Sequence, residues 1–359
     1  MKYIITSFNQ TNKILLALIF LIFLVRTSIA QISRIDQTGR NSVLVTDDSS
    51  KTPGEGEFVP LTQFTYAGGP RYTLDGSLPL MKTEIKPLNA SIVGGVFIGA
   101  IVFLHIHQTN AWWSGQRGKF HFEEDWVSAL QVDKAGHSYG GYMASYIMSE
   151  GLMASGFSWN AATLYGAGFG LLYQTYVETE DGFAKTWGFS PSDWYFDAIG
   201  PLFFLSQHYV PALQNITPKW QYIPSEWTGE PIINRPRTFI DDYNSSTFWW
   251  SVNVYNILPE SWKRYWVPWL NIAVGYGANS IDVKADPNGP PDQLSQRRYV
   301  VGLDYNLVEL LPKGGHFWNW LRQSLNFIKL PSPSIEFGAG GTKFSLLYPF
   351  RFNLNGFKF

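Results

Sequence analysis

The 359-residue chain contains no cysteine, and only 15% of its residues are charged. Without cysteine there is no disulfide framework, no disulfide-linked partner and no thiol nucleophile. Charge is also scarce, because an average soluble domain carries about 25% charged residues. The composition is nevertheless varied, with 17% aromatic residues. Low charge without low complexity favours buried or lipid-facing surface over disorder.

The N-terminus has the pattern of an export signal. Lys13 precedes the apolar run Ile14–Val25, and Ser28-Ile29-Ala30 is a small-x-small cleavage site. We expect residues 1–30 to be a signal peptide and the mature chain to begin at Gln31. The alternative is an uncleaved membrane anchor that ends at Arg26.

A strongly basic balance is absent as well. The whole chain has 27 Lys and Arg against 28 Asp and Glu, and residues 1–30 contain three of the cationic residues and none of the acidic ones. The mature chain therefore carries 24 cationic and 28 acidic residues, a net charge of −4. Proteins that bind nucleic acid are usually strongly basic, so we expect no nucleic-acid partner.

The first half of the mature chain divides into a polar and an apolar part. Residues 31–87 are rich in Gly, Pro, Thr and Asp, which predicts a flexible surface lead-in. Residues 88–108 contain no Lys, Arg, Asp or Glu, and about 20 residues are just enough to span a bilayer. The glycines in this segment are equally consistent with a tightly packed core helix. We expect residues 88–217 to form a bundle of about four helices, either membrane-embedded or soluble.

Small residues recur at every fourth position in two of the expected helices. The two stripes are Gly136, Gly140 and Ala144, and Ala162, Gly166 and Gly170. Such stripes let helix backbones approach closely, as they do in pairs of membrane helices. A soluble bundle with a small-residue seam is the alternative.

The pattern changes to that of strands in residues 218–359. Residues 270–278, 298–307 and 334–340 alternate larger apolar with small or polar residues, which is the period of a β-strand. Residues 245–258 and 316–328 are instead predicted to be amphipathic helices. We expect an α+β protein in which the helical bundle is followed by a mixed region with a few antiparallel strands.

The chain ends with alternating aromatic residues, in "YPFRFNLNGFKF". A terminal aromatic residue on an alternating strand is typical of outer-membrane barrels, but the strands are too few for a single-chain barrel, whose minimum is about eight. The pattern therefore favours contact with the outer membrane or with an outer-membrane protein. An ordinary edge strand is the alternative.

Ionisable residues gather near the ends of three expected helices. Asp133 and His137 are four residues apart and share a helix face, with Lys134 beside them. Asp133 lies near a probable helix start, where the backbone dipole favours a carboxylate. On the next helix the residues Gln174, Glu178 and Asp181 are spaced four and three apart, which again places them on one face.

The third helix begins with a capping box. Ser190-x-x-Asp193 has the required spacing, and Pro191 stands at the first helical position. Asp193 and Asp197 are four residues apart. If the helices are antiparallel neighbours, these groups all converge at one end of the bundle and form a polar pocket. Its walls are predicted to be Asp133, Lys134, Gln174, Ser190, Asp193 and Asp197, with His137, Glu178 and Asp181.

Three ordered motifs carry a family resemblance. They are Asp-Lys-x-x-His at 133–137, Glu-x-x-Asp-Gly at 178–182 and Gly-x-Ser-x-x-Asp-x-x-x-Asp-x-x-Gly at 188–200. Over residues 120–206 the chain resembles the YfiM-like family of predicted periplasmic lipoproteins, a domain of unknown function, in the long form of Bacteroidetes-type bacteria. It is more faintly similar to the VanZ-like membrane proteins. The resemblance implies an address in the bacterial envelope, but no activity.

One departure from that family concerns membrane attachment. Members are predicted lipoproteins, whereas this chain has no cysteine to acylate. Attachment must then come from apolar surface or from a partner, and we expect membrane lipid or an outer-membrane protein in that role. The expected location is the outer membrane, facing the periplasm.

The residues allow three interpretations of the site. A divalent metal, Zn or Mn, would be held by His137, Glu178, Asp181, Asp193 and Asp197, and would activate water for hydrolysis. Metal-free acid–base catalysis would use His137 oriented by Asp133. In the third interpretation the charges are structural, because buried charges must be paired. For either kind of catalysis the candidate residues are His137, Glu178 and Asp181.

Two motifs of hydrolytic enzymes are missing. Neither His-Glu-x-x-His nor the nucleophile elbow Gly-x-Ser-x-Gly occurs in the chain. The leading hypothesis is therefore an exported, membrane-associated scaffold or binding protein of the cell envelope. The alternative is a metal-dependent hydrolase that acts on an envelope lipid or glycan.

Overall fold

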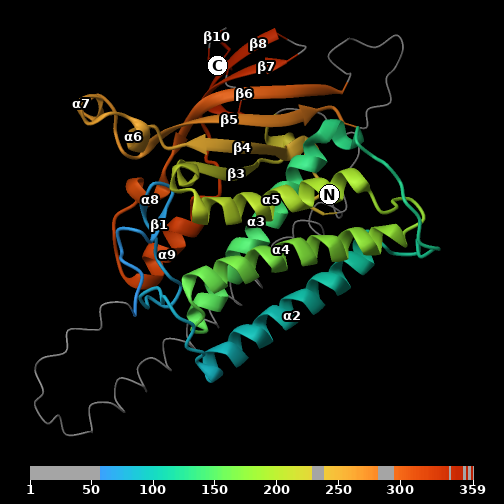
Figure 1. The fold of residues 1–359 in the computed structure, drawn as a ribbon. Coiled ribbons are helices and arrows are strands. Elements are labelled where there is room, and N and C mark those ends of the chain that lie inside the picture. The colour runs from blue at the N-terminus through green and yellow to red at the C-terminus, as the bar shows by residue number, and fades with distance from the viewer. Residues whose placement is uncertain are drawn as a thin grey trace, which may run out of the picture.

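A helical layer packs beside an antiparallel sheet in the computed structural model of the chain (Figure 1). The structure describes residues 57–228, 238–281, 295–338, 341–350, 353–354 and 357–358, so the predicted signal peptide and residues 31–56 lie outside the described part. The predicted α+β class is confirmed. The helices of the layer are α2 (Pro87–Ala111), α3 (Val132–Ala154), α4 (Trp159–Gly182) and α5 (Pro191–Tyr209).

The main sheet has six strands in chain order, and every neighbouring pair is antiparallel. Its strands are β3 (Ile216–Tyr222), β4 (Ser246–Val252), β5 (Leu270–Asn279), β6 (Gln296–Tyr305), β7 (Ser332–Gly338) and β8 (Gly341–Tyr348). The three strands predicted from alternation are confirmed as β5, β6 and β7. The helix predicted over 316–328 is confirmed as α9 (His316–Leu325).

Shorter elements connect these units. Two-stranded hairpins are formed by β1 (Thr65–Tyr66) with β2 (Gly69–Pro70) and by β9 (Asn353–Leu354) with β10 (Phe357–Lys358). Single helical turns are α6 (Val254–Ile257), α7 (Glu260–Lys263) and α8 (Leu307–Leu310). The 3-10 turns are η1 (Ser128–Gln131), η2 (Pro211–Asn215), η3 (Ser225–Thr228) and η4 (Tyr243–Ser245).

Side-chain caps fix where α4 and α5 begin. The Ser158 hydroxyl accepts a hydrogen bond from the Ala161 N–H, and the Ser190 hydroxyl accepts one from the Asp193 N–H. Each bond satisfies a backbone donor that a helix start otherwise leaves unpaired. Half of the predicted capping box is therefore present at α5, with Pro191 as the first helical residue. The reciprocal bond is missing, because the Ser190 N–H donates to Glu178 and not to Asp193.

The start of α3 is set by an unusual turn. Ala129, Leu130 and Gln131 have φ angles of 45°, 53° and 66°, in the left-handed region that non-glycine residues rarely adopt. The turn is held from the sheet side, because the Tyr276 hydroxyl donates to the Leu130 carbonyl and Arg297 donates to the Gln131 side chain. This turn fixes the direction of the first turn of α3.

Small residues bring α3, α4 and α5 close together. A Cβ atom on Gly166 of α4 would lie 2.6 Å from the Ser145 carbonyl oxygen of α3, and one on Gly141 would lie 2.8 Å from the Asp197 carbonyl oxygen of α5. Neither position can therefore hold a larger residue without moving a helix. The predicted stripe on α4 faces α3, as these distances require.

The predicted stripe on α3 is not the part of α3 that comes closest to α4. Gly136 faces Phe248 of β4, and Gly140 faces the Gln174 side chain. The closest approach is instead to the stripe of small residues one position further on, Gly141, Ser145 and Ser149. The start of α3 has small residues on several faces, so four-residue spacing alone does not select the right stripe.

Residues 57–86 differ from the predicted flexible lead-in. Phe64 and Tyr66 are buried, and Tyr66 packs against Tyr146 of α3 and against Phe327 after α9. The Arg71 guanidinium forms an ion pair with Glu150, with Nη2 and Oε1 2.6 Å apart. The polar composition of the segment predicts a position on the surface. A few aromatic residues nevertheless pack the segment into the core between the helices and the sheet.

Residues 245–258 were also predicted wrongly, as an amphipathic helix. They form β4 followed by the single turn α6. Trp249 and Ser251 point to the buried face of the sheet, whereas Trp250 points to the other face and is 41% exposed. The residues thus alternate with period two, and the neighbouring strands β3 and β5 fix that register.

The sheet buries its polar face. The buried side chains of β3, β5 and β6 include Lys219, Asn271 and Asp304, and Asp304 accepts hydrogen bonds from Lys219 and Ser251 at 2.7 and 2.6 Å. The sheet curls around these groups, since the Gln221 amide donates to the carbonyl of Tyr348 at the end of β8. The polar side chains thus lie inside the curl and out of water.

The opposite face is apolar. One cross-strand row runs through β4 to β8, and every member is at least 41% exposed. The row consists of Trp250, Val274, Val301, Ile335 and Phe344. Soluble antiparallel sheets bury the apolar face and expose the polar one. The orientation here is reversed, as it is in sheets whose outer face meets lipid.

The buried lysine Lys329 gives a testable pH dependence. Burial lowers its pKa to about 8, with Asp304 opposing and Lys219 adding to the shift. A lysine whose pKa falls on folding lowers the free energy of unfolding, and this effect is complete at pH values below the pKa in the folded state. The effect decreases as the pH rises toward the pKa in the unfolded state. Between pH 7 and 9.5 the wild type should gain about 2 kcal/mol relative to Lys329→Met. Urea unfolding at several pH values measures this, and a constant difference would contradict it.

Candidate functional site

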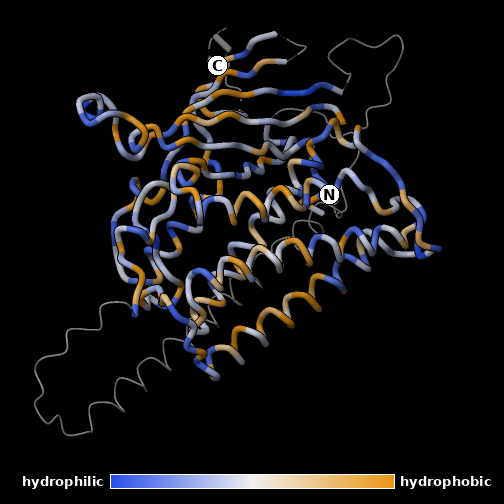
Figure 2. The backbone as a smooth tube through the Cα atoms, viewed as in Figure 1, coloured by the Kyte–Doolittle hydropathy of each residue, from blue (hydrophilic) through white to orange (hydrophobic). Residues whose placement is uncertain are grey.

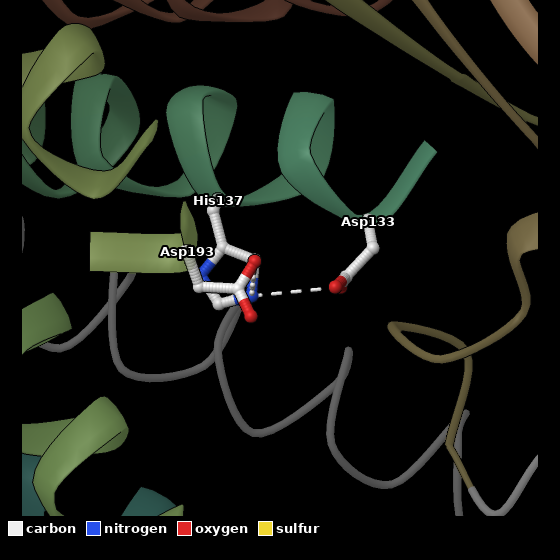
Figure 3. A group of neighbouring side chains, drawn as sticks. All are labelled: Asp133, His137 and Asp193. Carbon is white, nitrogen blue, oxygen red and sulfur yellow. Dashed lines mark ion pairs between the residues drawn. The ribbon is translucent and has the colours of Figure 1, made fainter. Parts of the chain in front are cut away.

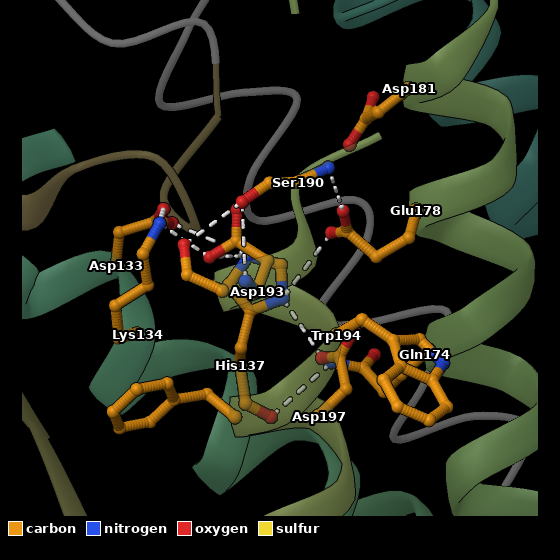
Figure 4. A network of polar contacts seen from close by, with 12 residues as sticks. Asp133, Lys134, His137, Gln174, Glu178, Asp181, Ser190, Asp193, Trp194 and Asp197 are labelled. Atoms are coloured by element: carbon orange, nitrogen blue, oxygen red, sulfur yellow. Dashed lines mark hydrogen bonds and ion pairs between the residues drawn. The ribbon is translucent and has the colours of Figure 1, made fainter. Parts of the chain in front are cut away.

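Three helix ends bring the predicted site residues together (Figure 4). The start of α3, the C-terminal half of α4 and the start of α5 meet at one end of the helical layer. The converging side chains are Asp133, Lys134 and His137 from α3, Gln174 and Glu178 from α4, and Ser190, Asp193 and Asp197 from the start of α5. We call this group the His137 cluster.

The imidazole of His137 lies between two pairs of carboxylates. Its Nδ1 is 2.9 Å from Asp197 Oδ1 and 3.6 Å from Glu178 Oε1. Its Nε2 is 3.5 Å from Asp133 Oδ1 and 3.7 Å from Asp193 Oδ1. Figure 3 shows the Nε2 side, with Asp133 and Asp193 directed toward the ring. Only the contact with Asp197 has the length of a hydrogen bond.

Lys134 neutralises the carboxylates on the Nε2 side. Its ammonium is 2.5 Å from Asp125 Oδ1, 2.6 Å from Asp193 Oδ1 and 3.3 Å from Asp133 Oδ2. The side chain is only 1% exposed, so these contacts are sheltered from solvent screening. The lysine therefore joins α3 to α5 and to the loop that precedes α3.

Hydrogen bonds orient the members of the cluster. The Gln174 amide donates to Asp197 Oδ1 at 2.7 Å, and the Ser190 N–H donates to Glu178 Oε2 at 3.2 Å. The Ser190 hydroxyl, which caps α5, also donates to Asp125 at 2.6 Å. The cluster and the cap of α5 are thus parts of one hydrogen-bonded network.

Two members of this network were missed in the sequence. Asp125 lies in the acidic stretch before α3, at no helical spacing from His137, and it contacts Lys134. Tyr243 comes from η4 beside the sheet, and its hydroxyl group donates a hydrogen bond to Asp133. The acidic stretch was a weak signal for Asp125. Nothing local signals Tyr243, because the fold brings it from 110 residues away.

Asp181 is the one predicted metal ligand that the structure does not direct toward His137. Its Oδ1 accepts a hydrogen bond from the indole N–H of Trp113, which follows α2. Its carboxylate belongs to neither group of side chains that could share a metal ion among the described residues. Figure 4 shows it at the edge of the network, beyond Glu178.

Burial and neighbouring charges raise the pKa values of three groups in the cluster. Burial opposes charge on His137, but Asp133 and Asp197 outweigh it and raise the imidazole pKa well above its ordinary value. Burial raises the pKa of Glu178 to about 9, with His137 opposing the shift and Asp193 and Asp197 adding to it. Burial likewise raises the pKa of Asp193 to about 7.

The cluster contains more negative than positive groups. Four carboxyl groups of the cluster and the adjacent Asp125 surround only two basic side chains, Lys134 and His137. The four are those of Asp133, Glu178, Asp193 and Asp197. Like charges that share a buried site cannot all ionise unless a further cation compensates them. The arrangement can therefore retain protons, hold the three helices together, or accept a cation.

Comparisons with known proteins identify one family. Residues 120–205 match the family model described as "Predicted periplasmic lipoprotein (DUF2279)". This range contains the three motifs of the His137 cluster, and it confirms the resemblance seen in the sequence. The match supports export to the cell envelope, and the family has no known function. No curated protein and no solved structure matches the chain.

Proposed function

We propose that this protein is a membrane-associated scaffold of the bacterial cell envelope, attached to a membrane through α2. In this proposal the His137 cluster fixes the relative positions of α3, α4 and α5. The helical layer and sheet then form a rigid body that holds a partner or a lipid surface. The observation that carries the proposal is the exposed apolar length of α2.

The helix α2 has 25 residues, a length of about 37 Å at 1.5 Å per residue. A bilayer has a hydrocarbon core of about 30 Å. By length and composition α2 is the one described helix that could cross a membrane, with a mean hydropathy of 2.0 in its most apolar window. Figure 2 shows it as an almost continuous apolar tube at the edge of the molecule.

A soluble core helix and a signal sequence can be equally apolar, but α2 resembles neither. The core helix of a soluble protein is mostly buried, whereas only 11% of the apolar window of α2 is buried. A signal sequence lies at the N-terminus, whereas α2 begins at residue 87. Its outer side chains include Ile98, 66% exposed, and Val102, 51% exposed. Contact with lipid would remove this surface from water.

The reversed polarity of the sheet supports the same proposal. Its exposed row of Trp250, Val274, Val301, Ile335 and Phe344 offers a second apolar surface of the kind that meets lipid or a membrane protein. The chain also has no cysteine that could carry a lipid. Apolar protein surface is then the means of attachment that the chain itself provides. We assign it to the outer membrane, facing the periplasm.

Charged substitutions on α2 test the attachment. Ile98→Lys combined with Val102→Lys should move the protein from the membrane to the soluble fraction, because each charge costs about 2.5–3.5 kcal/mol at the centre of a membrane helix. Both positions are exposed, so the fold should persist. Fractionation of cells followed by immunoblotting measures the distribution.

The matched control is Val127→Lys. Val127 is 71% exposed but lies outside α2, in the loop before α3. This variant should stay with the membrane as the wild type does. If the α2 double variant also stays there while remaining folded, α2 is not the site of attachment and the proposal is wrong.

A metal-dependent hydrolase that acts on an envelope lipid or glycan is the second candidate. The observation in its favour is that His137 belongs to two groups of side chains that could hold a metal ion, one with Asp133 and Asp193 and one with Glu178 and Asp197. A bound metal would supply an activated water. Metal binding in solution is therefore the first requirement of this function, and a protein that binds none would remove the candidate.

A further inference from the structure

We infer that His137, Glu178 and Asp197 form a site for one divalent transition-metal ion on the Nδ1 side of the imidazole. This goes beyond the scaffold proposal, which does not need a metal. It also narrows the five residues that the sequence suggested to three. The inference rests on the geometry of the donors, on an unpartnered buried oxygen and on the position of Lys134.

The donor atoms are close enough to share one ion. Nδ1 of His137 lies 2.9 Å from Asp197 Oδ1 and 3.6 Å from Glu178 Oε1, and all three donors lie within 4.8 Å of one another. Zinc binds nitrogen and carboxylate oxygen at about 2.0–2.2 Å, so tetrahedral ligands are about 3.4 Å apart. Small rotations of the two carboxylates would bring the three atoms to this spacing.

The carboxylate of Asp197 also carries an unpartnered oxygen. Oδ2 of Asp197 is buried and has no hydrogen-bond partner among the described residues, and the whole residue is 0% exposed. Its Oδ1 accepts from Gln174 and faces His137, so one half of the carboxylate is fully engaged and the other half is not. A buried charged group left unsatisfied costs several kcal/mol by order of magnitude. A cation bound by this carboxylate would supply the missing partner.

On the Nε2 side of the ring, the carboxylates are suited to orienting the imidazole and not to binding the ion. There Lys134 already compensates Asp133 and Asp193, and Tyr243 donates to Asp133. A histidine that binds a metal through one nitrogen usually donates its other N–H to a carboxylate, which fixes the ring orientation. Asp133 and Asp193 lie 3.5 and 3.7 Å from Nε2, so a small shift would let one of them accept a hydrogen bond from its N–H. They act as positioning residues in this arrangement, whereas Glu178 and Asp197 are the ligands.

The donor set indicates the class of metal. One imidazole nitrogen and two carboxylates suit Zn²⁺ or Mn²⁺, whereas Ca²⁺ and Mg²⁺ prefer oxygen donors alone. The three ligands come from α3, α4 and α5, one from each helix. A bound ion would thus join the same three helices that Ser190 and Lys134 connect around it.

Metal content of the full-length, detergent-solubilised protein tests the inference. The protein is stripped with chelator, dialysed against Zn²⁺ or Mn²⁺ alone, and analysed by mass spectrometry. Wild type should hold about one ion per chain, and Glu178→Gln and Asp197→Asn should bind at least about tenfold more weakly, as even loss of a supporting residue costs 10–100-fold. Asp181→Asn is the matched control, since it removes a carboxylate three residues from Glu178 that contacts Trp113 instead.

Either of two results would overturn the inference. One is a wild type that takes up no ion under these conditions. The other is binding by Glu178→Gln and Asp197→Asn equal to that of Asp181→Asn, which would place the ion elsewhere. If the two ligand variants do not fold, X-ray absorption of the zinc-loaded wild type decides, with one imidazole and oxygen donors expected and any other histidine count contradicting the site.

The metal test is independent of the membrane proposal. The α2 double variant Ile98→Lys with Val102→Lys should keep its metal, because α2 contributes no ligand. A variant released from the membrane can therefore still bind metal. A variant that binds no metal can likewise remain attached to the membrane. If one of the two proposals fails its test, the other is still decided by its own measurement.

Discussion

Replacement of Lys134 with methionine should lower the free energy of unfolding by about 3–5 kcal/mol, the usual cost of removing one partner from a buried ion pair. The ammonium lies within 3.3 Å of oxygens from Asp125, Asp133 and Asp193 and is almost fully buried. Methionine fills a similar volume but leaves the carboxylates without their common cation. Their repulsion would act directly on the contact between α3 and α5.

Urea unfolding of the two proteins in the same detergent measures this difference. Lys82→Met is the control, because Lys82 is exposed and changes there are usually within about 0.5 kcal/mol. Addition of Asp193→Asn to Lys134→Met should restore part of the lost stability by removing one of the uncompensated charges. A cost of less than about 1 kcal/mol for Lys134→Met, well below the usual range for a buried pair, would show that the lysine does not hold the cluster together.

Asp304→Asn is expected to have an effect of similar size, about 3–5 kcal/mol, inside the curled sheet. Asp304 and Lys219 are both 0% exposed, and Asp304 Oδ2 is 2.7 Å from the lysine ammonium. Asparagine keeps the shape of the side chain but removes the charge that compensates Lys219. The remaining partners of the ammonium are the neutral carbonyl of Tyr305 and the amide oxygen of Asn326.

A double-mutant cycle separates this pair from its surroundings. Lys219→Met alone and Asp304→Asn alone should each be costly. The double variant should cost clearly less than their sum, because it removes the Lys219 charge together with the carboxylate that compensates it. Circular dichroism and urea unfolding measure all four proteins. Simple additivity of the two changes would mean that Lys219 and Asp304 do not depend on each other.

The site was predictable where its geometry is local. Four-residue spacing places Asp133 with His137 on α3, and Ser190 with Asp193 marks the start of α5. The structure brings these groups together with Glu178 as that pattern requires. The orientation of a side chain in the last turn of α4 is decided by its neighbours instead. The indole N–H of Trp113, from a different part of the chain, donates to the Asp181 carboxylate, which therefore does not point toward His137.

Residue spacing also leaves part of the fold undetermined. Period-two alternation predicts β5, β6 and β7, but it is identical whether the apolar or the polar residues face inward. The reversed polarity of the sheet depends on Lys219, Asp304 and their partners, which come together only when the sheet curls. Tyr243 likewise reaches Asp133 only through the folded chain.

The most direct test of the central claim is the membrane association of the wild-type, full-length protein in the cell envelope. Cells are lysed, and the membranes are washed with high salt and then with carbonate. A protein attached through α2 should stay with the membranes, require detergent for release and float with lipid in a density gradient. Complete recovery of folded protein in the soluble periplasmic fraction, without detergent, would contradict this claim.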